Sequence, residues 1–524
     1  MLPSHPHLPT TDHPQAVHDY GIGSWPRRRA RIRPGSLALR HGDHTLTYAE
    51  LAGRVDYTAA ALIEHGVRAG DRVAYLGYNS IAAYELFFAV CRIGAIFVPL
   101  NTRLSALEVG ALLDDCSPVA LFYGADQSAT VESLTSAQRP ALACCLRDEN
   151  KVEVGADHIN DGRTTRFTTS IDIDDDAVIL YTSGTTGRPK GAVLTHANLT
   201  FNAMNQLAHV DVLSTDTALC VAPMFHATGL AMVALPTLFK GGTVVVTPRF
   251  DAATVLATIA EYRVTSFAAV PTMLQMLCEH PDFAATDLGS LRYVIYGGSS
   301  IAERTVRRWN QRAVDLLQGY GMTEASPGVT LALPHTGGDR PLSAGTVHFF
   351  TDIDVDSAVG PASGERAGEL LVRGLNMSRG YWGPPQDVPA ADGTGWFRSG
   401  DVVRISPDHQ LSVLDRVKDM IISGGENIFP AEIEALARTI PGIADCAVIG
   451  IPDQRWGEVG AAYVVPTSDS RWTADRLRNT LRENIAAYKV PQHVVFTDDL
   501  PRNATGKIDK QLLRARFLSS PVNR

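Results

Sequence analysis

The sequence predicts a layered α/β protein, with a large N-terminal domain of several subdomains and a smaller α+β domain at the C-terminal end. Three observations lead to this fold class. The 524 residues far exceed the usual size of one hydrophobic core. Strand and helix patterns alternate through about the first four hundred residues, which is typical of largely parallel sheets covered by helices. After about Gly345, short turns rich in Gly and Asp separate the strands, which indicates a distorted β unit.

The first helix is predicted between Thr47 and Gly66. Thr47 and Glu50 form a capping box, apolar residues recur at helical spacing, and Gly66 is a stop signal. Strands are expected at 72–76 and 95–100, with a helix at 82–90 between them. The same alternation returns around 218–248, 266–269 and 293–296.

The chain beyond about Gly345 differs in texture from the part before it. A strand at 369–373 belongs to the distorted β unit, and beyond Lys418 we expect strands near 444–451 and 461–465. A helix at 474–487 and a final helix from about Lys510 complete this unit. Because domain boundaries fall in polar segments with few contacts, we place the boundary in the charged stretch 415–419. The predicted parts are a flexible tail at 1–24, an N-terminal domain at 25–415 and a C-terminal domain at 416–524.

The composition is that of a globular enzyme. Apolar residues make up 45% and charged residues 20% of the chain. The net charge of −9 argues against nucleic-acid binding, and the basic run 27–33 is short enough to be a solvated helix face. The seven cysteines form no C-x-x-C pair, so neither a disulfide framework nor a zinc site is indicated. With no apolar stretch long enough to span a membrane, we expect a cytoplasmic protein.

A phosphate-binding loop is predicted between apolar strands at 177–180 and 192–194. Glycines let the backbone approach a ligand, and hydroxyl groups and exposed amides bind phosphate oxygens. Lys190 supplies a compact positive charge. The loop is not a Walker A motif, because Pro189 replaces the glycine before the lysine and a strand follows instead of a helix. The residues expected to bind a nucleotide here are Thr182, Ser183, Gly184, Thr185, Thr186 and Gly187.

This loop resembles the signature of the adenylate-forming superfamily, which includes acyl-CoA synthetases, peptide-synthetase adenylation domains and beetle luciferases. Four further segments resemble the motifs of that family in the same order, at 318–324, 395–401, 415–428 and 501–510. The resemblance spans roughly residues 25 to 517 and is closest to fatty-acyl- or aryl-CoA ligases. It implies ATP, Mg²⁺ and coenzyme A, and a small mobile C-terminal domain that rotates between two half-reactions.

The segment 318–324 resembles the nucleotide motif of this family. The resemblance implies that Tyr320 stacks on adenine, that Thr323 contacts the α-phosphate and that Glu324 supports Mg²⁺. An aromatic plane suits a base and a carboxylate oxygen suits a hard cation. Asp401 matches the carboxylate that accepts both ribose hydroxyls. The remaining nucleotide-binding residues that the resemblance implies are Gly297, Gly298, Ser299, Gly319 and Gly321.

The segment 415–428 resembles the hinge of the family. The resemblance places Arg416 near ribose and phosphate and makes Lys418 the pivot of the small domain. It assigns Gly424, Gly425 and Glu426 to the channel of the acyl acceptor. In the last motif, Lys507 matches the lysine that bridges the carboxylate and the phosphate during adenylation. The other residues expected to be catalytic are Thr323, Glu324 and Lys190. Lys510 is expected to be a solvated helix residue.

The acid specificity is best addressed at Phe225 and His226. Amino-acid-activating relatives carry Phe-Asp here, so an α-amino acid is disfavoured because its buried ammonium would lack a partner. His226 either lines an acyl tunnel or is a satisfied core histidine. The predicted pocket contains no Arg or Lys to pair with a second carboxylate, which favours an apolar fatty or aryl monoacid. Its residues are Phe225, His226, Val270, Tyr296, Gly321 and Ala325.

The predicted enzyme is therefore an AMP-forming acid–thiol ligase. It forms an acyl-adenylate from a small-molecule carboxylic acid and ATP, and transfers the acyl group to coenzyme A with release of AMP and pyrophosphate. Two alternatives stay open: transfer to the phosphopantetheine of a carrier protein, and transfer to an amine, including the nitrite-activating diazo-forming type. The sequence leaves the identity of the acid and the oligomeric state open.

Overall fold

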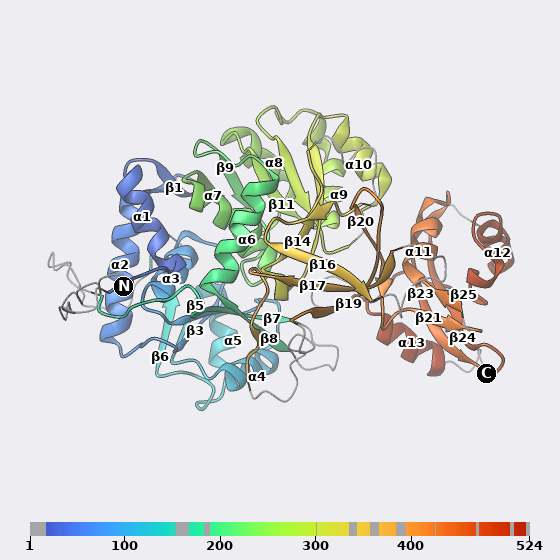
Figure 1. Ribbon diagram of the computed structural model, residues 1–524, viewed down its shortest axis with the longest axis horizontal. Helices are drawn as coiled ribbons and strands as arrows, with labels where there is room; N and C mark the ends of the chain where they lie inside the picture. The colour runs from blue at the N-terminus through green and yellow to red at the C-terminus, as the bar shows by residue number, and fades with distance from the viewer. Residues whose placement is uncertain are drawn as a thin grey trace, which may run out of the picture.

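A computed structural model describes residues 17–148, 150–152, 167–182, 189–299, 301–334, 343–356, 366–383, 395–424, 426–467, 471–502 and 508–519. A large N-terminal domain and a smaller C-terminal domain lie side by side along the longest axis (Figure 1). Both domains mix helices with sheets, so the predicted fold class is confirmed. No helix in the described part of the chain is long and apolar enough to cross a membrane.

The first sheet of the N-terminal domain has seven strands in the order β18-β8-β7-β4-β3-β5-β6. The strands β3 to β6 and β7 pair in parallel, whereas β8 is antiparallel to β7, and β18 is antiparallel to β8. The helices α3, α4 and α5 connect its parallel strands. The bounds are β3 Arg72–Leu76, α3 Ile81–Arg92, β4 Ile96–Pro99, α4 Ala106–Cys116, β5 Ala120–Gly124, α5 Ser128–Glu132, β6 Leu142–Leu146, β7 Asp176–Thr182, β8 Lys190–Thr195 and β18 Gly380–Tyr381.

The second sheet has nine strands in the order β15-β14-β13-β12-β11-β9-β10-β1-β2. Its central strands are parallel, so their carboxyl ends meet at one edge. The strands are β1 Leu37–His41, β2 His44–Thr47, β9 Thr217–Cys220, β10 Thr243–Val246, β11 Ser266–Ala269, β12 Tyr293–Tyr296, β13 Asp315–Gly321, β14 Gly328–Leu331 and β15 Thr346–Val347. The associated helices are α6 His196–His209, α7 Ala234–Lys240, α8 Ala252–Glu261, α9 Pro271–Glu279 and α10 Glu303–Asn310.

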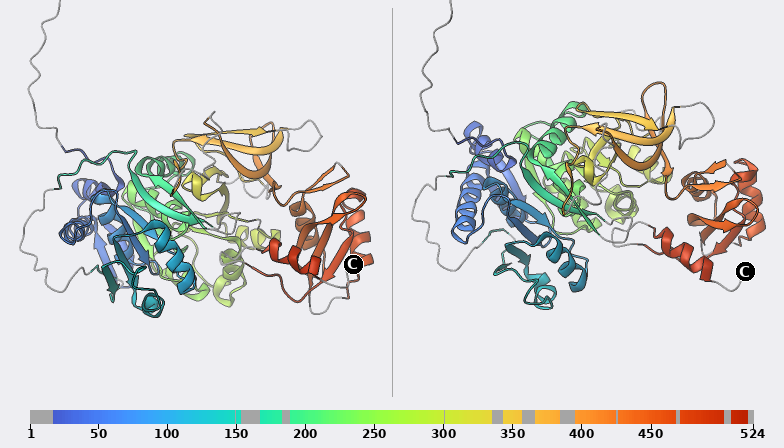
Figure 2. Two further views of the ribbon diagram at one scale, coloured as in Figure 1. Left: turned by 90° about the horizontal axis from the view of Figure 1, so that it is seen from below. Right: turned by 60° about the horizontal axis from the view of Figure 1, so that its bottom comes forward.

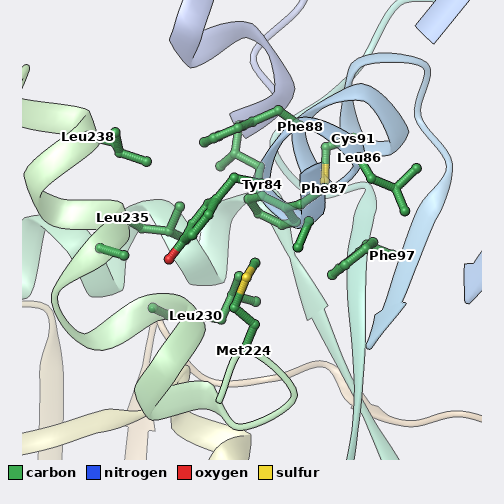
Figure 3. Packing of buried hydrophobic residues seen from close by; sticks show 14 of the residues in the cluster. Tyr84, Leu86, Phe87, Phe88, Cys91, Phe97, Met224, Leu230, Leu235 and Leu238 are labelled. Atoms are coloured by element: carbon green, nitrogen blue, oxygen red, sulfur yellow. The ribbon is translucent and has the colours of Figure 1, made fainter. Parts of the chain in front are cut away.

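The helix α3 is buried along its whole length. A helix that is buried on every side needs neighbours on every side, and α3 finds them in both sheets. The rings of Phe87 and of Phe97, on β4 of the first sheet, have centroids 5.5 Å apart. On the side of the second sheet, Figure 3 shows Tyr84 and Phe88 of α3 among the side chains Met224, Leu230, Leu235 and Leu238.

The N-terminal segment precedes the helices α1 (Trp25–Ile32) and α2 (Tyr48–Glu64). The predicted capping box is confirmed, because Thr47 Oγ1 accepts the Glu50 amide at 3.2 Å and Glu50 Oε2 accepts the Thr47 amide at 2.7 Å. The predicted flexible tail is wrong for its last residues. The Tyr20 amide donates to the Ile171 carbonyl at 2.9 Å, and Ile22–Ser24 are buried against α3. Residues 1–16 lie outside the described part.

The distorted β unit is a four-stranded antiparallel sheet in the order β16-β17-β19-β20. Figure 2 shows it, in yellow to brown, on the outside of the N-terminal domain. Its strands are β16 Thr351–Asp356, β17 Ala367–Gly374, β19 Phe397–Ile405 and β20 Leu411–Arg416. The strand β20 leads directly into the C-terminal domain.

The C-terminal domain packs helices on a sheet of β22-β21-β24-β23, with β25 pairing β24. The helix predicted at 474–487 is too long. It ends at Arg482, because Ala486 with a ψ of 141° has left the helical conformation, and a separate 3₁₀ turn follows at Ala487–Lys489. The bounds are β21 Ile421–Ser423, β22 Glu426–Ile428, α11 Pro430–Thr439, β23 Ile443–Asp453, β24 Gly457–Pro466, α12 Ala474–Arg482, β25 His493–Phe496 and α13 Lys510–Ser519.

Candidate active site

Three of the predicted nucleotide-binding residues meet at the end of β13. Tyr320 donates its hydroxyl to Asp401 Oδ2 at 2.6 Å, and Arg416 Nε lies 2.7 Å from Asp401 Oδ1. Asp401 and Arg416 are direct partners on the paired strands β19 and β20. Burial, and then the charge of Asp401, raise the pKa of Tyr320, so its hydroxyl stays a donor. The structure therefore joins residues that are distant in sequence into one polar cluster around Asp401.

The Asp401 carboxylate keeps acceptor capacity beyond these two partners. A carboxylate has about four lone-pair sites, and one on each oxygen is used here. Asp401 itself is buried, with 5% of its surface exposed. Its predicted contact with both ribose hydroxyls fits this arrangement and stays a prediction.

Two predicted glycines lie where two chain segments approach closely. A Cβ on Gly297, directly after β12, would be 2.7 Å from the Gly319 carbonyl on β13. A Cβ on Gly321 would be 1.8 Å from the Pro327 carbonyl. Packing alone therefore excludes larger residues at these positions. The segment 297–299 lies beside 318–321 because β12 and β13 are paired.

The predicted catalytic residues Lys190 and Glu324 share one neighbour, Tyr381. The Tyr381 hydroxyl donates to Glu324 Oε1 at 2.5 Å, and Lys190 Nζ lies 5.5 Å from the centroid of the Tyr381 ring. Burial, and then the charge of Glu324, raise the pKa of Tyr381, which keeps its hydroxyl protonated. Thr182 donates its hydroxyl to the Lys190 carbonyl at 3.3 Å. Ser183, Gly184, Thr185, Thr186 and Gly187 lie outside the described residues.

Tyr381 was missed by sequence reasoning, although the structure holds it firmly. It lies on β18, which pairs with β8 next to Lys190. The Trp382 amide donates to the Gly191 carbonyl at 2.7 Å, and the Ser378 amide donates to the Glu324 carbonyl at 2.6 Å. The only sequence signal was a pair of aromatic residues after a glycine, which predicts no partner by itself.

The predicted acid-pocket residues follow neighbouring parallel strands. Phe225 and His226 follow β9, Val270 follows β11, and Tyr296 ends β12. Phe225 is buried and His226 is half-buried, with their ring centroids 4.7 Å apart. The Tyr296 hydroxyl donates to Gln318 Oε1 at 3.2 Å, and burial raises its pKa. These side chains thus lie along one sheet edge, next to Gly321.

Ala325 does not belong with the other pocket residues. It is fully buried in an apolar cluster with Val329, Leu370 and Val372, under the four-stranded sheet. Its carbonyl accepts the Asn376 side chain at 2.9 Å. The expectation that Ala325 lines the pocket is wrong, because the 3₁₀ turn at Thr323–Ala325 presents its side chain to this core.

The predicted acceptor loop lies on the hairpin β21–β22 of the C-terminal domain. Gly424 has a φ of +60°, its amide donates to the Trp456 carbonyl at 2.8 Å, and a Cβ would lie 2.7 Å from the Trp456 ring. Both the positive φ and the close Trp456 ring favour glycine at position 424. Lys418 and Glu426 are exposed, and Gly425 lies outside the described residues.

Lys510 is not the solvated residue that the sequence suggested. Its Nζ lies 2.9 Å from Glu434 Oε1, and its side chain is 20% exposed. Burial by itself lowers the pKa of Lys510, but the charges of Glu434 and Asp415 outweigh it and leave the pKa raised. Burial raises the pKa of Asp415 to about 6, against the effect of Lys510. Lys507 lies outside the described residues.

A magnesium site would draw on Glu324. Within the described ranges, no cluster of three or more His, Cys, Asp or Glu is placed to hold a metal. Mg²⁺ usually takes one or two protein carboxylates and completes its shell with substrate phosphates and water. One oriented carboxylate near Lys190 fits that requirement, whereas a structural zinc site would need about four protein ligands.

Comparison with known proteins defines the class of protein. A family described as AMP-binding enzyme matches residues 26–382, and its companion, the AMP-binding enzyme C-terminal domain, matches residues 432–507. The chain belongs to the AMP-binding enzyme family. The predicted adenylate-forming superfamily and the predicted class of acid–thiol ligase are confirmed.

Particular relatives extend this result. The chain is 44% identical over 505 residues to a feruloyl-CoA synthase of an Amycolatopsis species, covering 96% of this chain and 100% of that enzyme. It is 38% identical to an indoleacetate–CoA ligase of Aromatoleum aromaticum, covering 94% and 97%. It is also similar to the structure of o-succinylbenzoate CoA synthetase from Bacillus subtilis in complex with its acyl-adenylate. That match has a TM-score of 0.80 and 30% identity, and covers 94% and 98% of the two chains.

Proposed function

We propose that the protein activates an apolar aryl or fatty monoacid with ATP, as an acyl-adenylate, and transfers the acyl group to coenzyme A. The observation that carries this proposal is the junction of Lys190, Tyr381 and Glu324. Glu324 of this junction lies on the segment 318–324. The same segment contains Tyr320, which contacts Asp401 in the cluster with Arg416. The Lys190 cation and the oriented Glu324 carboxylate thus lie together. Tyr320, with the hydroxyl acceptor Asp401 beside it, comes shortly before Glu324 in the chain.

The first half-reaction needs positioning and charge neutralisation more than acid–base chemistry. A carboxylate oxygen of the acid bonds to the α-phosphorus of ATP, and the bond to pyrophosphate breaks. Lys190 neutralises charge on the phosphates, and Lys507 is proposed to bridge the carboxylate and the α-phosphate. Mg²⁺ held by Glu324 would supply further charge neutralisation. Tyr381 orients the Glu324 carboxylate beforehand, so little reorganisation is needed in the transition state.

The second half-reaction replaces the phosphate by a thiol. The sulfur of coenzyme A bonds to the acyl carbon, the bond to AMP breaks, and the thiol proton is released. We propose that the C-terminal domain turns about Lys418, withdraws Lys507 and presents the loop of Gly424 and Gly425. Positions with few contacts to either domain suit a pivot, and Lys418 is exposed between β20 and β21.

Of the two proposed acid classes, we expect the enzyme to prefer aromatic acids over fatty acids. Feruloyl-CoA synthase and indoleacetate–CoA ligase are named for aromatic acids. In this chain Phe225, Val270 and Tyr296 offer an apolar and aromatic edge, and none of the proposed pocket residues is a lysine or arginine. Each CH₂ removed from a buried acyl group should weaken binding by about 0.8 kcal/mol.

A screen of acid-dependent pyrophosphate release tests this function. The panel is ferulate, indoleacetate, octanoate, o-succinylbenzoate and phenylalanine, each with and without coenzyme A. We expect the aromatic monoacids to give the largest kcat/KM, and thioester to form only with coenzyme A present. A clear preference for phenylalanine or the dicarboxylate would contradict the proposed acid class. Product analysis distinguishes the alternative reactions. In these assays a phosphopantetheinylated carrier protein or an amine replaces coenzyme A, or nitrite replaces the carboxylic acid.

A further inference from the structure

The side chain of Asn79 connects the two large sheets. Asn79 follows β3 of the first sheet and is buried, with 2% of its surface exposed. Its carboxamide reaches the chain that leaves β9 and β10 of the second sheet. Nδ2 donates to the Ala222 carbonyl at 2.9 Å and to the Thr247 carbonyl at 3.4 Å, and Oδ1 accepts the Met224 amide at 2.8 Å.

The chemistry of these contacts requires an amide at this position. Two carbonyl oxygens need donors and one backbone N–H needs an acceptor. A hydroxyl has a single donor, whereas a side-chain amide has two donors and an acceptor at its tip. An aspartate of the same shape would keep the acceptor but place a charged oxygen against two carbonyl oxygens. Buried groups left without partners are costly, so the carboxamide determines where the segment 222–224 lies.

The segment that Asn79 holds leads directly into Phe225 and His226. The His226 amide closes a turn on the Pro223 carbonyl at 3.0 Å. From the other side, Gly229 of the π-helical turn Thr228–Met232 packs on the segment, because a Cβ there would lie 2.1 Å from the Pro223 carbonyl oxygen. Such π-helical turns are frequent at functional sites. The segment is thus held between Asn79 and Gly229.

Two of the atoms that Asn79 contacts belong to residues that line a small apolar cavity. Cys220, with its Sγ 3.7 Å from Asn79 Nδ2, and Ala222 line this cavity together with Thr228 and Gly229. Its volume is about 10 Å³, which leaves room for one water molecule at most. A cavity of this size permits only a slight shift of the segment when its bonds to Asn79 are lost, and Phe225 and His226, which follow the segment in the chain, would shift with it.

We propose that Asn79 is a positioning residue for acid recognition. It acts through the segment 222–224, which it fastens so that Phe225 and His226 keep their place at the sheet edge. The inference rests on the proposed function, because it assigns these two residues to the acid. It concerns the acid alone, since Asn79 touches neither the cluster of Asp401 nor the junction at Tyr381.

The test compares Asn79→Asp with a matched variant, Asn205→Asp. Asn205 is also fully buried, its Oδ1 accepts the Phe350 amide at 2.8 Å, and its Nδ2 donates to Thr351 at 3.3 Å. Both variants remove buried donors, so both should lower the melting temperature. Only Asn79→Asp should raise the KM for the acid, and the KM for ATP should stay unchanged. The expected increase is about ten- to a hundredfold, which is the usual effect of losing buried hydrogen bonds.

Asn79→Ser provides a second variant if the aspartate prevents folding, since it introduces no charge. It should raise the acid KM in the same direction and broaden the preference among the acids of the panel. Equal acid KM values in wild type and both Asn79 variants would overturn this inference alone, as would equal increases for acid and ATP. A wild-type enzyme that activates no acid would overturn the proposed function and this inference together.

Discussion

Replacing Tyr381 with phenylalanine removes one oxygen atom from the candidate active site. The lost hydroxyl donates to Glu324 Oε1 at 2.5 Å in the wild type. The ring stays, and with it the contact to Lys190 Nζ, 5.5 Å from the ring centroid. The pairing of β18 with β8 uses backbone groups and should also persist. The substitution therefore isolates the orientation of the Glu324 carboxylate.

The magnitude follows from the type of hydrogen bond. A hydrogen bond to a charged group contributes about 1.5–3 kcal/mol, and each 1.36 kcal/mol changes a rate tenfold. If the hydroxyl orients Glu324 only for adenylation, Tyr381→Phe should lower kcat/KM for that step by about 10- to 150-fold. A less firmly held carboxylate should also bind Mg²⁺ more weakly, so the Mg²⁺ concentration for half-maximal rate should rise.

Single-turnover measurements of the two half-reactions provide the assay. Acid-dependent pyrophosphate release should slow, whereas thioester formation from supplied acyl-AMP and coenzyme A should keep its wild-type rate. Tyr463→Phe is the matched control, because its buried hydroxyl donates to the Leu513 carbonyl at 3.2 Å in the C-terminal domain. If folded Tyr381→Phe enzyme releases pyrophosphate at the wild-type rate, or loses both half-reactions equally, Tyr381 does not position Glu324.

Three further predictions concern other parts of the chain. Lys510→Met should lower the free energy of unfolding by about 3–5 kcal/mol, because it removes the cation 2.9 Å from the buried Glu434 and beside the buried Asp415, and leaves Glu434 with Arg438 at 3.9 Å. Lys489→Met, which breaks a more exposed pair with Glu432, should cost less than about 1 kcal/mol in the same denaturant titration. Burial, and then the charge of His209, lower the pKa of His348 from 6.5 to about 3, so the unfolded chain binds more protons. Stability should therefore fall as the pH drops below 6.5, by up to about 1.4 kcal/mol per pH unit, and His348→Gln should flatten this slope in unfolding curves. Lys507→Ala should slow acid-dependent pyrophosphate release by about 10²- to 10³-fold but spare thioester formation from acyl-AMP, and equal loss of both steps would argue against domain alternation.

Much of the architecture was predictable because its causes are local in the chain. The capping box of Thr47 and Glu50 needs only three residues of spacing, and the structure contains it. The strands at 72–76, 266–269 and 293–296 appear at their predicted positions, since period and composition decide them. The family also followed from motifs that are each continuous in sequence. Errors occurred at element ends, as for α12, which ends at Arg482 because the backbone leaves the helical conformation by Ala486.

The contacts that join the site depended on tertiary structure. Nothing near Tyr381 in the sequence indicates that β18 pairs with β8 and reaches both Lys190 and Glu324. Asn79 reads as an ordinary polar residue after a strand until the second sheet packs beside it. Ala325 directly follows the motif segment 318–324, yet its side chain packs into the core of another subdomain.

Lys510 shows the physical reason for this division. Helical periodicity places a residue on a face of its own helix, and by that criterion Lys510 at the start of α13 was expected in water. Whether the face meets water or a carboxylate depends on which element packs against it, and here α11 brings Glu434 to 2.9 Å. Local hydrogen bonds and side-chain periodicity are properties of a chain segment, so the sequence alone determines them. Desolvation and charge pairing are properties of two surfaces in contact, so only the assembled fold decides them.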